Sequence, residues 1–517
     1  MKNFKEIISN SWQKSIILML FATLTVYLSA ANANVEKWRV FSVELNGPSI
    51  GNPYDDVKLS AVFKNKSQEV KVVGFYNGDG KYVIRFSPDQ TGAWTYITSS
   101  NIPELSGKTG KFSCVKPAKT NHGPLEVIDT WYFRYADGTP YFQVGTTCYQ
   151  WTSQPKDLQD KTIKTLSTAP FNKIRLCIFP KWYIYNRTEP AIVAYENITD
   201  TTYNLEKFNP AYWNNLEMRI SQLDSLGIQA DIVLFHPYDK WGFATMTMPQ
   251  YEKYIRYAIA RLAPFQNVWW SIANEYDFMT VPPRKNHSGN MQKEDWDHFF
   301  QLIQAEDPFH LFISIHNGTV WYDHTKSWVS HASIQNSKLE QGLSLREKYN
   351  KPVVYDECKY EGNIEAGWGQ LTAQTMTQRF WVGAMNGCYV GHGECIKAPE
   401  DILWWGKGGV LRGESPKRIA FFRKFMEALP FDKMKSTHVN DSVFELSQAE
   451  KVYLIYSLKP GKFTITLEGK KEYKVELIDT WNMTVKKLDN VKPGENIFDA
   501  PKNDYLLKIS AFSKAGK

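Results

Sequence analysis

The fold is decided by the stretch Trp270-Ser271-Ile272-Ala273-Asn274-Glu275-Tyr276, an apolar run that changes abruptly to a polar Asn-Glu pair. A second run, Val353-Val354-Tyr355-Asp356-Glu357, also ends on a glutamate. Continuous apolar runs of this length are typical of strands that are buried on both faces. We therefore expect each glutamate at the carboxyl end of a buried parallel strand.

The same rhythm extends in both directions from these runs. Over residues 120–433, strand-like apolar runs alternate with amphipathic helical segments, which is the pattern of parallel βα units. About eight such units over this length predict a (β/α)8 TIM barrel. The strands are expected to end near residues 145–147, 174–179, 230–236, 275, 314–317, 328–331, 357 and 388–392.

On either side of the barrel the pattern changes to short runs in which apolar and polar residues alternate. Runs at 57–63 and 82–86, separated by turn residues, predict an N-terminal immunoglobulin-like β-sandwich over residues 34–119. Similar runs at 452–457 and 463–467 predict a small C-terminal β-sandwich over residues 434–517. The fold class is thus α/β, a barrel flanked by two β-domains.

Residues 1–33 have a different character. Lys2, Lys5 and Lys14 precede an apolar stretch, 16–28, which is followed by Ala31-Asn32-Ala33. This order is that of a secretory signal peptide, and the apolar stretch is too short to span a bilayer comfortably. We expect cleavage near Ala33, no stable membrane insertion afterwards, and a periplasmic or extracellular protein.

Composition narrows the class of ligand. Aromatic residues make up 15% of the 517 residues, with 18 Trp, and such rings often stack on the apolar faces of sugars. The net charge of +7 is dispersed among acids, so no nucleic-acid partner is expected. Six cysteines are too few for a disulfide scaffold, although Cys388 and Cys395 are left open as a pair.

The two strand-end glutamates point to one chemistry. Active-site residues of such barrels lie at the carboxyl ends of the strands. Glu275 closes the fourth expected strand and Glu357 the seventh, on opposite sides of the barrel mouth. Glycoside hydrolysis needs two carboxylates in that relation, about 5 to 5.5 Å apart when configuration is retained and about 6.5 to 9.5 Å apart when it is inverted.

These motifs resemble the retaining (β/α)8 glycoside hydrolases of clan A. The resemblance implies that Glu275 is the acid/base, Glu357 the nucleophile, and Asn274 a hydrogen-bond donor to the sugar 2-hydroxyl. With residues 144–147 and 235–237, Trp404-Trp405 and the flanking β-domains, the whole layout is similar to the bacterial apiosidase-like glycoside hydrolases of Bacteroidetes. It covers nearly the whole mature chain and implies no cofactor.

Other polar and aromatic residues near the expected strand ends are candidates for sugar contacts. The histidines suit hydrogen bonds to hydroxyl groups, and the aromatic rings suit stacking. A buried structural role for each histidine, and a loop-anchoring role for each ring, stay open. The candidate substrate-binding residues are Asn274, His236, His316, His331, His392, Glu394, Trp182, Tyr183, Trp404 and Trp405.

Two alternatives concern the carboxylates and a metal. Asp356 precedes Glu357, but neighbouring strand residues point to opposite faces, so only one of them is expected in the pocket. A metal site is not predicted, because the histidines form no HxxxH or HxH motif and would have to converge from four strands.

The sequence therefore predicts an exported retaining glycoside hydrolase that acts on a plant or host polysaccharide or oligosaccharide. A noncatalytic glycan-binding protein on a hydrolase scaffold is the alternative, and metal-dependent hydrolysis is a third. Both glutamates are intact, which favours the enzyme. The sugar, the linkage, exo or endo action, glycan binding by the β-domains and the oligomeric state do not follow from these motifs.

Overall fold

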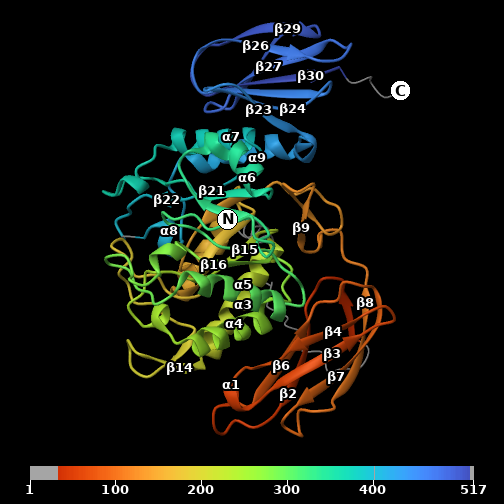
Figure 1. Ribbon diagram of the computed structural model, residues 1–517, viewed down its shortest axis with the longest axis vertical. Coiled ribbons are helices and arrows are strands. Elements are labelled where there is room, and N and C mark those ends of the chain that lie inside the picture. Colours follow the sequence, from red (N-terminus) through yellow and green to blue (C-terminus); the bar gives the residue numbers. More distant parts are fainter. Residues whose placement is uncertain (1–32, 401, 513–517) are drawn as a thin grey trace, which may run out of the picture.

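The computed structural model describes residues 33–400 and 402–512, so the expected signal segment lies outside them except for Ala33. The chain forms a central barrel with a β-sheet region on either side (Figure 1). The N-terminal region packs beside the barrel, and the C-terminal region sits on the helices at one side of it.

The barrel is an eight-stranded parallel sheet in the order β17-β16-β15-β12-β11-β21-β19-β18. Strands follow one another around the sheet in chain order, as expected for consecutive right-handed βα units. A parallel bridge between His316 and Ser333 joins the two edge strands, so the sheet is nearly closed. The strands are β11 (Val144–Thr147), β12 (Lys173–Cys177), β15 (Gln229–Phe235), β16 (Val268–Ala273), β17 (Ile313–Ser314), β18 (Ala332–Gln335), β19 (Val353–Glu357) and β21 (Tyr389–His392).

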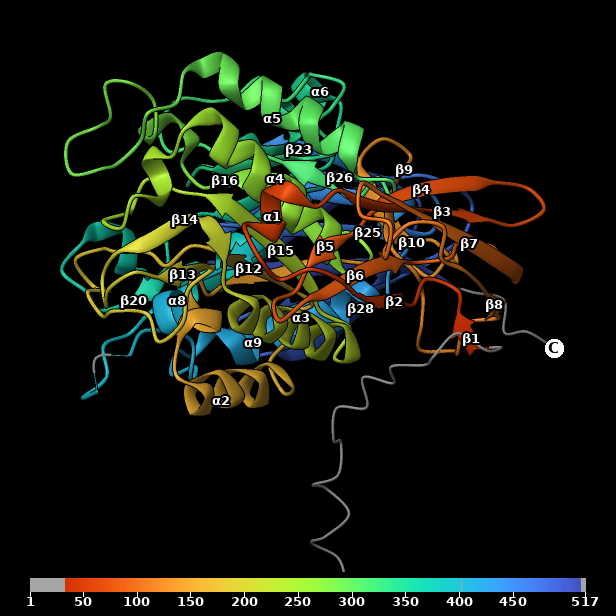
Figure 2. The same ribbon diagram turned by 90° about the horizontal axis from the view of Figure 1, so that it is seen from below.

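Helices surround this sheet, and Figure 2 shows several of them around β12, β15 and β16. Local sequence sets their starts: the Asn209 side chain caps α3 before Pro210, and Thr247 with Gln250 forms a capping box at α4. The helices of this part are α2 (Lys156–Leu166), α3 (Pro210–Ser225), α4 (Met248–Leu262), α5 (Lys293–Glu306), α6 (Gly342–Tyr349), α7 (Ala373–Met385), α8 (Trp404–Lys407) and α9 (Ser415–Glu427).

Longer loops at the barrel mouth carry small β-elements of their own. These are the pairs β13 (Tyr195–Asn197) with β14 (Tyr203–Phe208), and β20 (Glu361–Gly362) with β22 (Glu394–Cys395). Loops at this end of a barrel build its active site.

The opposite end of the barrel is closed by a hairpin, β9 (Leu125–Ile128) and β10 (Tyr132–Tyr135). Its Phe133 is buried and packs on Trp269, Phe312 and Tyr389, with ring centroids 4.9 to 5.3 Å apart. These aromatic rings form a solid floor, and the barrel interior is open only at the mouth.

The N-terminal region is a sandwich of a five-stranded sheet and a three-stranded sheet. A buried ion pair between Arg85 and Glu217 of α3 ties it to the barrel, at 2.7 Å. Its elements are β1 (Ala33–Glu36), β2 (Phe41–Asn46), α1 (Pro53–Asp56), β3 (Leu59–Lys64), β4 (Glu69–Val73), β5 (Phe75–Tyr76), β6 (Lys81–Phe86), β7 (Gly92–Ser100) and β8 (Thr109–Val115).

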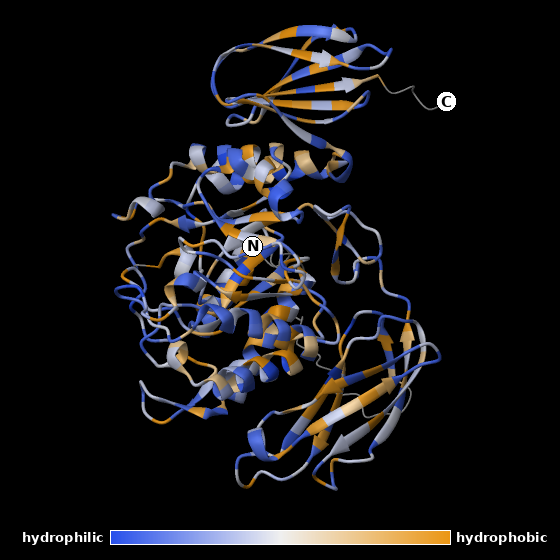
Figure 3. Cartoon of the chain, viewed as in Figure 1, coloured by the Kyte–Doolittle hydropathy of each residue, from blue (hydrophilic) through white to orange (hydrophobic). Residues whose placement is uncertain are grey.

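The C-terminal region pairs a six-stranded sheet with a two-stranded one. It rests on α7, where Gln378 donates to Asp504 at 2.7 Å. Figure 3 shows apolar residues, in orange, along the strands of this region and of the barrel. Its strands are β23 (Lys435–Asn440), β24 (Val443–Gln448), β25 (Val452–Ser457), β26 (Gly461–Leu467), β27 (Tyr473–Asp479), β28 (Thr484–Val491), β29 (Gly494–Ala500) and β30 (Tyr505–Ala511).

One strand differs from the sequence-based expectation. The sixth barrel strand was expected to end at residues 328–331, but β18 begins at Ala332. The run Trp328-Val329 is apolar because it packs on the barrel's side as part of the connection, with Val329 in the core. The six cysteines are all buried and free, including Cys388 and Cys395.

Candidate active site

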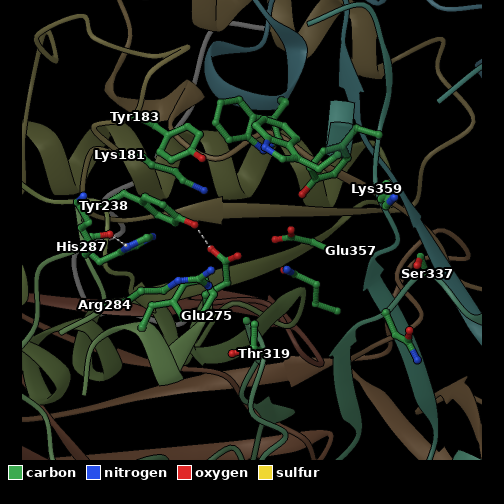
Figure 4. Close-up of a pocket in the computed structure, with 18 residues that line it drawn as sticks. Lys181, Tyr183, Tyr238, Glu275, Arg284, His287, Thr319, Ser337, Glu357 and Lys359 are labelled. Carbon is green, nitrogen blue, oxygen red and sulfur yellow. Dashed lines mark hydrogen bonds between the residues drawn. The ribbon is translucent and has the colours of Figure 1, made fainter. Parts of the chain in front are cut away.

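Glu275 and Glu357 face each other across the mouth of the barrel, as Figure 4 shows. Glu275 is the second residue after β16, and Glu357 is the last residue of β19. Glu275 has a left-handed backbone with φ 51°, which turns the chain sharply where the strand ends. Such strained positions are concentrated at functional sites. Both carboxylates line a cavity of about 610 Å³.

A single side chain limits the distance between the two carboxylates. With its amide nitrogen facing them, Gln335 at the end of β18 donates to Glu357 Oε2 at 3.1 Å and to Glu275 Oε1 at 3.3 Å. These two oxygens therefore lie no further apart than the sum of those distances. That limit falls short of the roughly 6.5 Å at which the spacing of inverting glycosidases begins.

The surroundings of Glu275 favour its protonated form. Burial, and then the negative charge of Glu357, raise the pKa of Glu275 to about 7. The Tyr238 hydroxyl and the Asn274 side-chain nitrogen donate to its Oε2, the latter at 3.1 Å. A carboxyl group with this pKa holds its proton near neutral pH and can also give it up, as a general acid/base must.

The surroundings of Glu357 favour its ionised form. Burial opposes ionisation, but the positive charge of Arg175 and Lys181 and the hydrogen bond from the Tyr149 hydroxyl hold the pKa of Glu357 below its usual range. Arg175 Nη1 lies 3.4 Å from Glu357 Oε1. The two carboxyl groups thus have pKa values shifted in opposite directions, which separates an acid role from a nucleophile role.

Beneath the cavity lies a layer of charged side chains inside the barrel. Lys173 Nζ lies 2.7 Å from Asp231 and 2.6 Å from Asp356, and all three side chains are almost completely buried. Arg175, two residues along β12, approaches Asp231 at 3.5 Å. We call Lys173, Arg175, Asp231 and Asp356 the interior charge layer. Each charge in it has an opposite charge beside it.

Only Glu357 of the pair Asp356 and Glu357 lines the cavity, as expected, but the expectation that the two side chains point to opposite faces is wrong. Both side chains bond inner-face residues of β12, Asp356 to Lys173 and Glu357 to Arg175. The reason is a register shift between Ile334 and Gln335, where β18 pairs with β19. A β-bulge of this kind breaks the alternation of side chains and can redirect one of them.

Several of the predicted sugar contacts lie in or beside the cavity. Tyr183 and Trp405 line it, with ring centroids 6.0 Å apart. Asn274 is completely buried beside it, bonded to Glu275 and accepting from the Tyr149 hydroxyl at 3.0 Å. Trp368 from the loop after β20 adds a third ring, 5.3 Å from that of Trp405. Aromatic rings so arranged can stack on a sugar.

Other predicted contacts lie behind the cavity wall. Trp182 packs against Trp241, and Lys240 lies over its ring at 3.6 Å. Trp404 is fully buried and donates to the Thr146 hydroxyl at 3.0 Å. In a Trp-Trp pair at the start of a short helix only one ring faces the mouth, because successive side chains of a helix point in different directions.

The predicted histidines also differ in their surroundings. His236 is buried against the Phe179 carbonyl at 3.1 Å, and His392, the last residue of β21, stacks on Phe171. His331 precedes β18 and packs on Trp269 at the floor, because the strand starts where it was expected to end. None of these three lines the cavity.

His316 and Glu394 complete the set. His316 is fully buried within the barrel, near enough to Glu357 and Asp356 for their charges to affect its pKa, which burial lowers to about 3. Glu394 accepts backbone N–H bonds from Arg412 and Gly413 and so fixes the loop before α9, and burial raises its pKa to about 7. Neither residue lines the cavity.

Most of the cationic side chains that line the cavity were not predicted from the sequence. Lys181, Arg284, Lys285 and Lys359 all face the cavity, from the loops after β12, β16 and β19. The one feature of the sequence that could have predicted them is that each follows a strand that ends at the mouth. Tyr149 and Tyr238, which bond the two glutamates, likewise follow β11 and β15.

Within residues 33–400 and 402–512, no group of three or more His, Cys, Asp or Glu side chains is arranged to hold a metal ion. Across the same ranges, no helix has the length and apolarity needed to cross a membrane.

Comparison with known families gives three matches along the chain. Residues 129–394 match the family "Apiosidase-like, catalytic domain". Residues 34–101 and 441–507 match two domains of unknown function, DUF5060 and DUF5605. A search of curated proteins finds no match.

Comparison with solved structures points the same way. The chain is 35% identical to a candidate glycoside hydrolase from Bacteroides vulgatus, with a TM-score of 0.85 over 93% of this chain and 100% of that one. A family 5 glycoside hydrolase from the same species is 14% identical, with a TM-score of 0.57 over 77% of this chain and 96% of that one. The second likeness is one of fold alone.

Proposed function

The chain belongs to the apiosidase-like family of glycoside hydrolases, and we propose that it cleaves a glycan with retention of configuration, using Glu357 as nucleophile and Glu275 as acid/base. The observation that carries this proposal is the bridging contact of Gln335 to both carboxylates. It keeps their facing oxygens closer together than the roughly 6.5 Å at which the spacing of inverting enzymes begins, while their pKa values are shifted in opposite directions.

In the first step the ionised Glu357 attacks the anomeric carbon and forms a glycosyl ester. Glu275 gives its proton to the glycosidic oxygen, so the leaving group departs as an alcohol. Tyr149 donates to Glu357 and so fixes the direction from which it attacks. Asn274, bonded to Glu275 and Tyr149, is placed to contact the sugar beside the reacting carbon.

In the second step the ionised Glu275 takes a proton from water, and that water attacks the anomeric carbon of the ester. Glu357 leaves as a carboxylate and Glu275 regains its proton. Two displacements at one carbon restore the original configuration.

The substrate class and the location of the protein are proposed on separate observations. We propose a plant or host polysaccharide or oligosaccharide, supported by the aromatic rings of the cavity, which suit sugar faces. We also propose export, supported by the basic, apolar and small-residue order within residues 1–33. Fractionation of the native organism, with detection of the cleaved N-terminus, tests the latter.

The test of the mechanism compares three Glu→Gln variants on a panel of plant and host glycans. Glu275→Gln and Glu357→Gln should each lower kcat/KM at least about 1,000-fold on a substrate with a poor leaving group. Glu394→Gln is the matched control, because Glu394 also has a pKa raised to about 7 but lies outside the cavity. NMR of the first-formed sugar should show the anomeric configuration of the substrate. An inverted product, or activity in both cavity variants, contradicts the proposal.

A further inference from the structure

The cavity holds a buried lysine whose ammonium group is not paired with a carboxylate. Lys181 has an exposed fraction of only 3%. Across the part of the chain that the structure describes, no carboxylate oxygen lies within 4.0 Å of its Nζ. Buried ammonium groups are normally paired, since transfer of an unpaired charge out of water is costly.

Lys173 shows what a paired lysine in this barrel looks like. It lies eight positions earlier and is equally buried, with carboxylates at 2.7 and 2.6 Å. Lys181 instead lies over three aromatic rings, with Nζ at 3.8 Å from the centroid of Tyr149, 4.1 Å from Tyr238 and 4.9 Å from Trp405. The rings stabilise the cation in part and leave its side toward the cavity free for a ligand.

The backbone of Lys181 is fixed on both sides by hydrogen bonds with buried side chains. The Gln150 side chain accepts from Lys181 N at 2.7 Å, and the Asn186 side chain donates to Lys181 O at 2.9 Å. Gln150 and Asn186 are themselves bonded at 2.8 Å, and both are buried. The backbone of the lysine is therefore held in place before any ligand arrives, and the three rings confine its side chain, which lowers the entropy cost of binding.

The ammonium group lies beside the two glutamates. Two of its three rings belong to Tyr149, which bonds Glu357, and Tyr238, which bonds Glu275. In Figure 4 its nitrogen points toward the space between the two glutamates. A group that contacts Lys181 must therefore belong to the sugar whose anomeric carbon lies between the carboxylates, rather than to a distant unit of the chain.

Three further cations surround the entrance. Arg284, Lys285 and Lys359 line the cavity and are exposed. None of them forms an ion pair with the residues that the structure describes, and the Arg284 guanidinium lies over Phe278 at 4.3 Å. With Lys181, four cationic side chains line the cavity, and the only acidic ones are Glu275 and Glu357. Glu275 is protonated when the proposed reaction begins.

We infer that the sugar bound between Glu275 and Glu357 is anionic, and that Lys181 binds its carboxylate or sulfate group while the entrance cations attract further negative charge on the glycan. This inference rests on the proposed function for the place of the sugar. Its chemistry comes from the lysine alone: an acidic group replaces the missing partner of a buried ammonium, as Asp231 and Asp356 do for Lys173.

The test measures binding of free sugars, which hydrolysis does not consume. Calorimetry of the wild-type protein compares glucuronate with glucose, galacturonate with galactose, and galactose 6-sulfate with galactose. We expect at least one anionic sugar to bind about tenfold or more tightly than its neutral counterpart. The uronates and the sulfate ester distinguish the two sources of negative charge. If every neutral sugar binds as tightly as its anionic counterpart, the inference is wrong.

Two variants then assign the preference to Lys181. Lys181→Met should remove the preference for the anionic sugar, whereas Lys285→Met, at the exposed entrance, should leave most of it. Melting temperatures establish that both variants are folded. A preference that survives in Lys181→Met contradicts the inference. Hydrolysis of paired nitrophenyl uronides and neutral glycosides is measured separately: selective binding without hydrolysis counts against the proposed function and supports this inference.

Discussion

The interior charge layer and the cavity directly above it differ in how they treat buried charge. In the layer, Lys173 and Arg175 are placed against Asp231 and Asp356, and the charges satisfy one another. In the cavity, Lys181 has aromatic rings around it, and Glu275 accepts hydrogen bonds but has no cation within ion-pair distance among the described residues. Paired charges therefore satisfy one another inside the barrel, whereas unpaired ones lie where a ligand can act.

The largest expected effect tests the two lysines against each other. Lys173→Met leaves Asp231 and Asp356 buried without their common counter-ion, and should lower the free energy of unfolding by about 3 to 5 kcal/mol. Lys181→Met removes a charge that has no carboxylate within 4.0 Å and only a more distant attraction to Glu357, so the loss of stability should be much smaller than in Lys173→Met. Urea unfolding followed by tryptophan fluorescence measures both. An equal loss in the two variants would remove the distinction between layer and cavity.

The next effect concerns Glu275 and the sign of its contribution to stability. Its pKa of about 7 in the folded protein exceeds the ordinary value near 4.5, so the wild type loses stability as pH rises from about 4.5 to about 7. Glu275→Gln does not titrate and should be the more stable of the two at pH 8, by about 2 to 3 kcal/mol. The difference should shrink toward pH 4. A difference that is constant with pH speaks against an uncompensated charge at this position.

The same pKa sets the alkaline limit of activity. Because Glu275 must start protonated, kcat/KM should fall about tenfold per pH unit above pH 7. On the acid side, activity should persist below the usual carboxyl range, because the pKa of Glu357 is lowered. A pH profile with an activated substrate, whose leaving group needs no proton, separates the two limits: only the alkaline one should weaken.

A smaller effect is expected where the two regions meet. Tyr149 bonds Glu357 and lies beneath Lys181, so Tyr149→Phe keeps the ring and removes one hydrogen bond to a charged oxygen. The loss should be about 1 to 2 kcal/mol of transition-state stabilisation, roughly tenfold in kcat/KM, with little change in unfolding. If Tyr149→Phe changes the free energy of unfolding but not kcat/KM, Tyr149 has a structural role like that of the interior charge layer.

The smallest effect separates the cavity from its outer wall. Trp405 lines the cavity, whereas Trp182 packs behind it on Trp241. Trp405→Leu should raise KM several-fold by loss of a stacking surface. Trp182→Leu should leave KM within about twofold, since it does not line the cavity. Steady-state kinetics on one substrate compares the pair, and an equal rise in KM would extend the binding surface to Trp182.

Much of the fold followed from local patterns. The apolar runs that close on Glu275 and Glu357 predicted β16 and β19 with both glutamates at the mouth, because strand ends in a parallel barrel share one edge. The sixth strand was missed because a packed connection, Trp328-Val329, is as apolar as a strand. Because of that error, His331 was expected at the mouth, whereas it lies against Trp269 at the floor.

The cavity was less predictable than the strands that support it. Lys181 and Arg284 come from irregular loops, where no period in the sequence says which side chain turns inward. The inner-face position of Asp356 was not expected because alternation assumes an unbroken ladder, and a β-bulge breaks it: Ile334 and Gln335 pair with Tyr355 and Glu357, which leaves Asp356 unpaired. Long-range pairing decides such positions, and it leaves no local signal.

The aromatic floor beneath the barrel determines how the leaving group and water reach and leave the cavity. Phe133, Trp269 and Phe312 close the far end of the barrel, so the cavity opens to solvent at the mouth. Whatever group departs in cleavage must pass out by the way that water comes in. Departure of the first product and arrival of the hydrolytic water are therefore consecutive events at one opening.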